Sequence, residues 1–80
     1  MGPVFDAIAE LIAARNDCDV SEITEASRFE DLGIDSLDTV EMMMDLEDKL
    51  QAGVEIELTE KVETVGELVA FVERLLDENK

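Results

Sequence analysis

The sequence predicts an all-α fold, a small and mostly antiparallel four-helix bundle with three main helices, one short helix and a long first loop. Apolar residues recur every three or four positions in three separate stretches of the 80-residue chain, which is the periodicity of amphipathic helices. A short alternating stretch at 54–58 has no second strand with which to pair. A chain of this length is expected to form one domain, residues 1–80, whose helices pack against one another.

The first helix is predicted to begin near Pro3, because proline suits the first helical turn. Its apolar stripe consists of Val4, Ile8, Leu11 and Ile12, and Arg15 extends the same spacing. From Asn16 to Asp19 the apolar periodicity is lost, so the helix is predicted to end there.

A long connection is predicted from about Asp17 to Asp35. We expect its apolar residues to anchor it to the core, namely Val20, Ile23, Phe29 and Leu32. Ser21 with Thr24, and Ser27 with Glu30, are candidates for capping short turns within it. Loops this long in compact domains are usually functional.

The second helix is predicted from Ser36 to about Leu50. Asp35 is suited to cap it, since its carboxylate can accept hydrogen bonds from the free backbone N–H groups of the first turn. Asp38 adds a second acid where the helix dipole favours negative charge. Ser36 then occupies the first helical position, where an attached phosphate would meet the positive end of that dipole. This pattern indicates Ser36 as an attachment point for a phosphate-linked group.

The second helix has two different faces when about 100° is allowed per residue. One is a core stripe made of Thr39, Met42, Met43, Leu46 and Leu50. The other mixes acids with apolar side chains and comprises Ser36, Leu37, Val40, Glu41, Met44, Glu47 and Asp48. We interpret this second face as a docking surface. Its acids would steer a basic partner, and its three apolar side chains would supply contact area, a role that suits methionine because it repacks against different partners. Scattered exposed apolar residues on an ordinary solvated face are the alternative.

The last third of the chain contains a connector and a third helix. Gly53 is predicted to stop the second helix, and Val54, Ile56 and Leu58 are predicted to anchor an extended connector. Thr59 is a candidate cap for a short turn at Glu60–Glu63. A capping box is predicted at Thr64 and Glu67. The final helical stripe comprises Val65, Leu68, Val69, Val72, Leu75 and Leu76.

The composition argues against several classes of function. The chain has 22 acids, six Lys or Arg residues and a formal net charge of -16, so nucleic acid would be repelled and basic partners favoured. There is no histidine to activate Ser36, so no enzyme is expected. The lone Cys18 has no disulfide partner. With no apolar run long enough to span a membrane and no signal peptide visible, we expect a cytoplasmic protein.

No defined metal site is expected, and loose surface binding of divalent ions by clustered carboxylates is the alternative that the composition leaves open. Asp17, Asp19, Ser21 and Glu25 alternate as calcium ligands do in an EF-hand. That template, however, requires glycine at its sixth position and glutamate at its twelfth. Here those positions hold Glu22 and Arg28.

The stretch Asp31-Leu32-Gly33-Ile34-Asp35-Ser36-Leu37-Asp38-Thr39-Val40-Glu41 closely resembles the attachment motif of acyl carrier proteins of bacterial-type, dissociated fatty acid synthesis. The resemblance extends over nearly the whole chain, from about Val4 to Leu76. It implies that a phosphopantetheinyl transferase moves 4′-phosphopantetheine from coenzyme A onto Ser36, beside the family's acid at Asp35. The thiol of that arm would carry acyl chains as thioesters, and the protein would be a monomer.

The same resemblance implies roles for other positions. Partner recognition by fatty acid synthesis enzymes with basic docking patches would fall to Leu37, Asp38, Val40, Glu41, Met44, Glu47 and Asp48. A core that shelters the acyl chain would include Phe29, Met42, Met43, Leu46, Val62 and Leu68. The chain departs from the family in lacking a proline in the connector and in having three consecutive methionines, Met42 to Met44.

Two alternatives to a general fatty acid carrier remain open from the sequence. One is a carrier dedicated to a polyketide or another specialised acyl pathway. The other is an acidic interaction module that is never modified, in which Ser36 would be an ordinary helix-start residue.

Overall fold

A computed structural model describes residues 2–51, 53, 56–57 and 61–78. Three α-helices dominate it: α1 at Pro3–Asn16, α2 at Ser36–Leu50 and α3 at Val65–Glu78, with a short 3-10 helix, η1, at Val20–Glu22. No strand occurs among the described residues, where the nearest approach to a sheet is one isolated antiparallel bridge between Arg28 and Thr64. The all-α prediction is therefore confirmed.

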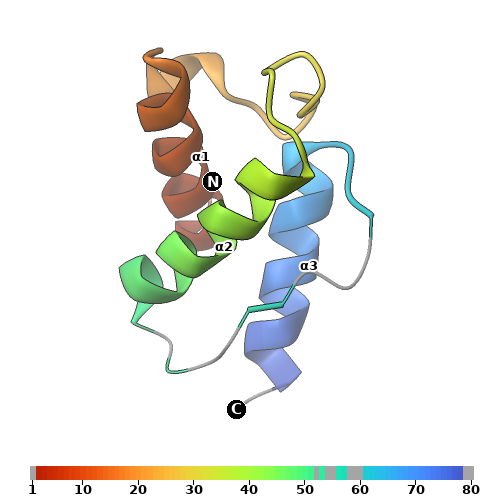
Figure 1. The fold of residues 1–80 in the computed structure, drawn as a ribbon. Coiled ribbons are helices and arrows are strands. Elements are labelled where there is room, and N and C mark those ends of the chain that lie inside the picture. Colours follow the sequence, from red (N-terminus) through yellow and green to blue (C-terminus); the bar gives the residue numbers. More distant parts are fainter. Residues whose placement is uncertain (1, 52, 54–55, 58–60, 79–80) are drawn as a thin grey trace.

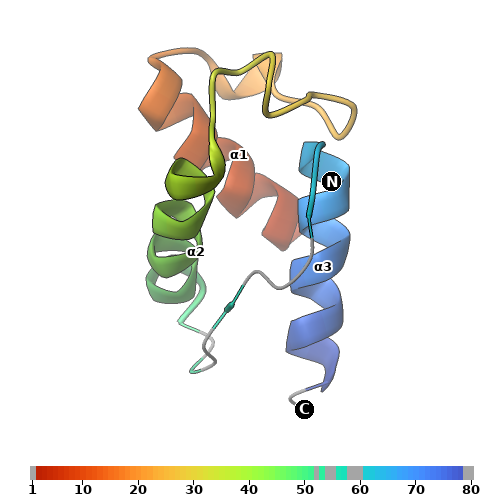
Figure 2. The same ribbon diagram turned by 45° about the vertical axis from the view of Figure 1, so that its right-hand side comes forward.

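The helix α1 lies between the other two in the packing. It contacts both α2 and α3 and runs in the direction opposite to both (Figure 1). The long connection from α1 crosses the end of the molecule where α2 and α3 begin, as the rotated view also shows (Figure 2). None of the described helices is long and apolar enough to cross a lipid bilayer.

The core is mostly aliphatic, with Phe5, Phe29 and Phe71 among its buried side chains, and it draws on all three α-helices. Its largest fully buried side chains are Ile8, Ile12, Met42, Met43, Leu46, Val65, Leu68 and Val72. Predicted loop anchors Ile23 and Phe29 are buried as well, and Leu32 and Cys18 pack partly buried against the core. Val20 is 43% exposed, so its predicted role as an anchor is wrong.

The short helical element is not where the sequence pattern placed it. In the first loop, Asp19 rather than Ser21 caps η1, because its Oδ1 accepts from Ser21 N at 2.9 Å while Glu22 Oε2 accepts from Asp19 N at 2.9 Å. Ser27 Oγ accepts from Thr24 N at 3.0 Å, closing a local turn. The predicted turn at 60–63 has no helical residue at 61–63, and Thr59 and Glu60 lie outside the described residues.

The helix α2 ends before the predicted glycine stop. Gln51 adopts the left-handed conformation with φ 51°, and its backbone N–H donates to the carbonyls of Asp48 and Glu47. These bonds satisfy the last turn, so Gly53, although its φ is also positive at 65°, follows the end rather than making it. In the connector, Ile56 is buried as predicted, whereas Val54 and Leu58 lie outside the described residues.

Backbone hydrogen bonds tie the first loop to the start of α3. Val65 N donates to Ser27 O at 2.9 Å, and Phe29 N donates to Glu63 O at 3.0 Å. The predicted capping box is half formed: Glu67 N donates to Thr64 Oγ1 at 3.2 Å, but the Glu67 carboxylate accepts from Glu63 N. The two backbone bonds hold the first loop, which leads to Ser36, against the start of α3.

Candidate functional site at the start of α2

Ser36 is the first residue of α2, and its side chain is exposed. Asp35 precedes it in extended conformation and accepts a hydrogen bond on Oδ1 from Asp38 N at 2.9 Å. Asp38 Oδ2 in turn accepts from Asp35 N at 3.2 Å, and Thr39 Oγ1 donates to Asp35 O at 3.0 Å. The predicted N-cap is confirmed, and these three side-chain bonds fix the backbone on either side of Ser36.

The turn that precedes the site requires a glycine. Gly33 has φ +69°, and a Cβ built there would meet nothing within 4 Å. Glycine is therefore favoured at position 33 by the backbone conformation and not by a lack of space, since other residues are strained at positive φ. The next residue, Ile34, is buried in the core, so the chain is anchored immediately before it emerges at Asp35 and Ser36.

The surroundings of Ser36 favour a residue that is acted upon. Its neighbours Asp35 and Asp38 are committed to capping, and the chain has no histidine. No group of three or more candidate metal ligands occurs among the described residues. What the position does offer is an accessible hydroxyl at the positive end of a helix dipole.

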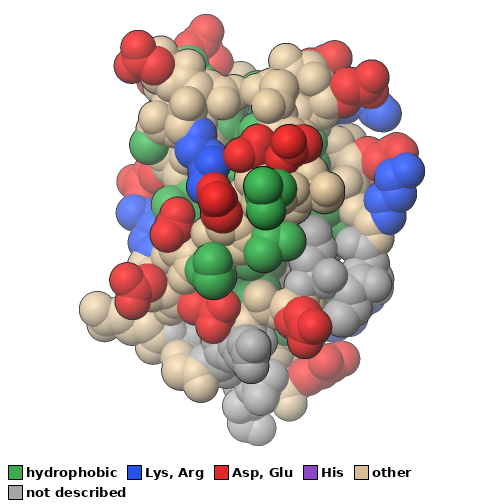
Figure 3. Space-filling model, in the orientation of Figure 1, with side chains coloured by type: hydrophobic (Ala, Val, Ile, Leu, Met, Phe, Trp, Pro, Cys, Tyr) green, Lys and Arg blue, Asp and Glu red, His purple; other side chains and the backbone are tan. Residues whose placement is uncertain are grey.

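The outward face of α2 carries three large apolar side chains. Leu37 is 67% exposed, Val40 51% and Met44 59%. Figure 3 shows hydrophobic side chains over α2 with acidic side chains around them. The predicted acids Glu41 and Asp48 are exposed and Glu47 is half-buried, while Thr39, Met42, Met43 and Leu46 on the opposite side are buried. The two-faced character predicted for this helix is therefore confirmed.

Asp38 lies at the edge of that face, where α1 approaches α2. Arg15, in the last turn of α1, places Nη1 3.2 Å from Asp38 Oδ1 and Nη2 2.9 Å from Glu41 Oε2. The hydrogen bond to Glu41 and the nearby carboxylates raise the pKa of Arg15 above its ordinary value. Sequence reasoning assigned Arg15 only to the helical stripe. A cation at a position of that stripe indicated that Arg15 faces another helix, but nothing in the local sequence indicated which acids it meets.

Comparison with known proteins identifies the family. Residues 6–72 match the family described as phosphopantetheine attachment site. The chain is 49% identical over 70 residues to an acyl carrier protein of Exiguobacterium sp., which covers 86% of this chain and 89% of that protein. It is 42% identical over 71 residues to an acyl carrier protein of Wolinella succinogenes, covering 88% and 93%. The chain belongs to the acyl carrier protein family.

Membership in this family makes the protein an acyl carrier and not an enzyme, and its cofactor is 4′-phosphopantetheine. The residues present fit that group, because the exposed Ser36 hydroxyl stands clear of the core at a helix start. A phosphate on Ser36 would meet the positive end of the α2 dipole.

The positions that the family resemblance implies for sheltering an acyl chain lie in the core or pack against it. Phe29, Met42, Met43, Leu46 and Leu68 are all buried, and Val62 is half-buried. A depression at the surface is lined by Val62 together with Lys61, Glu67, Ala70, Phe71 and Arg74.

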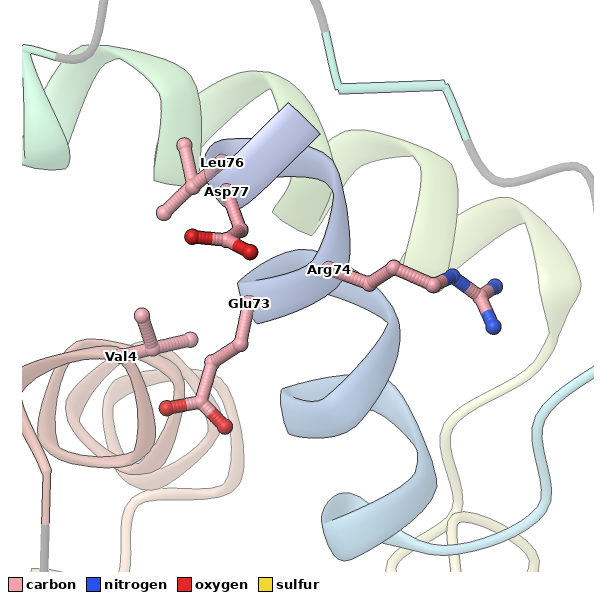
Figure 4. A pocket seen from close by; sticks show the side chains of 5 residues that line it. All are labelled: Val4, Glu73, Arg74, Leu76 and Asp77. Carbon is pink, nitrogen blue, oxygen red and sulfur yellow. The ribbon is translucent and has the colours of Figure 1, made fainter. Parts of the chain in front are cut away.

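A second depression lies between the start of α1 and the second half of α3. Val4, Glu73, Arg74, Leu76 and Asp77 line it, and the Arg74 side chain points away from Val4 (Figure 4). Its position separates it from the attachment site.

Proposed function

We propose that residues 1–80 form a single carrier domain that holds acyl groups as thioesters on a 4′-phosphopantetheine arm attached to Ser36, for the enzymes of fatty acid biosynthesis. The observation that carries this assignment is the exposed Ser36 at the first position of α2, inside the matched attachment-site region.

Attachment forms one bond at Ser36 Oγ. A phosphopantetheinyl transferase transfers 4′-phosphopantetheine from coenzyme A: a phosphodiester to Oγ forms, the pyrophosphate bond of coenzyme A breaks, and 3′,5′-adenosine diphosphate leaves. Asp35 and Asp38, the acids next to Ser36, are engaged in capping bonds. We therefore assign the removal of the hydroxyl proton to a base of the transferase. The thiol of the arm then makes the thioester that activates the acyl group.

The chain's own contribution is positioning and recognition. Asp35 holds Ser36 at the helix start through its bond to Asp38 N. Leu37, Val40 and Met44 offer apolar contact area on α2, and acids surround them. Opposite charges raise association rates by steering, so partners with basic patches are favoured. We assign this docking face to Leu37, Asp38, Val40, Glu41, Met44, Glu47 and Asp48.

We further propose that the protein works as a monomer in the cytoplasm and that it binds no nucleic acid. A net charge of -16 opposes self-association and binding to phosphate backbones. The acyl chain is proposed to enter the core around Met42 and Met43, whose flexible side chains repack easily.

Intact-mass measurement after incubation with coenzyme A, magnesium and a promiscuous phosphopantetheinyl transferase tests the assignment. The unaltered protein should gain about 340 Da, and Ser36→Ala should gain nothing. Ser21→Ala, which removes another exposed serine hydroxyl, serves as the matched control and should gain the same mass as the unaltered protein.

A mass gain in Ser36→Ala would move the attachment to another residue. No gain in the unaltered protein, with the transferase active on a control carrier, would overturn the carrier function.

A further inference from the structure

Arg15 occupies two of the acids that the docking face offers to partners. We propose that Arg15 is a built-in competitor, which a partner's basic side chain must displace from Asp38 and Glu41, and that it thereby determines which partners bind this face well. This inference rests on the proposed function and adds a specificity residue to it, located on α1 and outside the attachment motif.

The geometry of the contact supports competition. The two guanidinium nitrogens bind separate carboxylates, Nη1 to Asp38 Oδ1 at 3.2 Å and Nη2 to Glu41 Oε2 at 2.9 Å. The other oxygen of Asp38, Oδ2, accepts from Asp35 N at 3.2 Å. Arg15 therefore contacts the oxygen of Asp38 that the helix cap does not use, and a partner cation can take that position only after Arg15 leaves.

The contact is also easy to exchange. The side chains of Arg15, Asp38 and Glu41 are 29%, 34% and 49% exposed, and ion pairs at such exposure are weak. A partner can displace Arg15 without unfolding either helix. An arginine of a partner, with its planar two-pronged donor, can replace both bonds at once, whereas a lysine replaces a single point contact.

Competition affects one half of the docking face. Within the described part of the chain, no Lys or Arg side chain pairs with Glu47 or Asp48, further along α2. Partners that contact Met44, Glu47 and Asp48 are thus unaffected by Arg15. Partners that contact the first two turns of α2, next to Ser36, meet two acids whose negative charge Arg15 partly neutralises.

The chain supplies a matched control for the experiment. At the other end of the contact between α1 and α2, Lys49 Nζ lies 2.8 Å from Glu10 Oε2. Arg15→Gln and Lys49→Gln each remove one cation and its interhelical ion pairing, which is with two carboxylates for Arg15 and with one for Lys49. Only Arg15→Gln releases Asp38 and Glu41.

The measurement is the KM of each protein as substrate of the phosphopantetheinyl transferase, at low and at high salt, with the melting temperature of each variant recorded. We expect Arg15→Gln to lower KM roughly two- to fivefold relative to Lys49→Gln at low salt, the scale set by one exposed ion-pair site. The difference should disappear at high salt. In an Asp38→Asn, Glu41→Gln background, Arg15→Gln should give no such gain.

Equal KM changes in Arg15→Gln and Lys49→Gln would show that only net charge matters, and would overturn the inference. A higher KM in Arg15→Gln would overturn it too, because Arg15 would then be holding the acids in place for the partner. If Arg15→Gln does not fold, Arg15→Lys tests the same point, since it retains the charge but loses the two-pronged contact, and its KM should be lowered. Either failure leaves Ser36 labelling of the unaltered protein intact, whereas loss of that labelling would overturn the proposed function itself.

Discussion

Asp35 and Asp38 cap the start of α2 by bonding to each other's backbone, with Asp38 N donating to Asp35 Oδ1 at 2.9 Å and Asp35 N donating to Asp38 Oδ2 at 3.2 Å. Ser36 lies between these two residues in the sequence and is exposed. Asp35→Ala removes one acceptor, so we expect it to lower the free energy of unfolding by about 1 kcal/mol and to slow modification of Ser36. Urea unfolding and transferase kinetics measure the two effects.

Asp35→Asn separates capping from charge. Asparagine retains an acceptor oxygen and caps helices about as well as aspartate, so this variant should keep most of the stability lost in Asp35→Ala. If both variants lose the same stability, charge at the helix start rather than the hydrogen bond to Asp38 N is responsible.

The start of α2 was predictable from the sequence because its bonds are local. Asp35 and Asp38 are three residues apart, and a capping residue followed by an acid at that spacing has a known geometry. The Arg15 contacts span 23 and 26 residues, so they depend on how α1 and α2 cross and no local pattern encodes them.

The loop and the end of α2 show a different limit, because several neighbouring residues compete for the same local role. Hydrophobicity predicted that Ile23 and Phe29 would be buried, and they are, but it could not show that Asp19 would cap η1 and leave Val20 43% exposed. Likewise, the glycine preference at helix ends pointed to Gly53, whereas Gln51 takes the left-handed conformation.

The same substitution, methionine to alanine, made separately at Met42 and at Met44 tests the two faces of α2. Met42 is fully buried and Met44 is 59% exposed. Met42→Ala should lower the free energy of unfolding by about 2–5 kcal/mol, because it leaves a cavity. Met44→Ala should change it by less than about 0.5 kcal/mol and instead raise the KM for the transferase. Comparable losses of stability in both variants would contradict the assignment of Met44 to the docking face.

Gly66 lies against the backbone of Glu25 at the point where the first loop meets α3. A Cβ at position 66 would be 3.0 Å from Glu25 O, and that oxygen accepts from Gly66 N at 2.9 Å. Gly66→Ala must therefore displace the loop or lengthen this bond. We expect a net loss of stability of up to about 1 kcal/mol, although alanine is ordinarily favoured over glycine within helices by a similar amount. Thermal melting and amide exchange at position 66 measure it.

Ala70→Gly calibrates that result, because Ala70 is exposed on the same helix and its change reports helix propensity. It should cost about 1 kcal/mol. A Gly66→Ala protein that is more stable than the unaltered chain would mean that the loop at Glu25 yields freely.

Asp19 gives the stability a defined dependence on pH. The hydrogen bond from Ser21 N lowers the pKa of Asp19 below its ordinary value. A carboxylate with a lowered pKa in the folded state stabilises that state above the unfolded pKa, about 4, and the stabilisation is lost as pH falls through the folded pKa. The melting temperature of the unaltered protein should therefore exceed that of Asp19→Asn at pH 6, and the difference should shrink below about pH 4.

Glu30→Gln, which neutralises an exposed acid in the same loop, reports the general effect of removing one negative charge. A difference for Asp19→Asn that stays constant from pH 6 to about pH 2 would show that the ionised carboxylate of Asp19 does not stabilise η1.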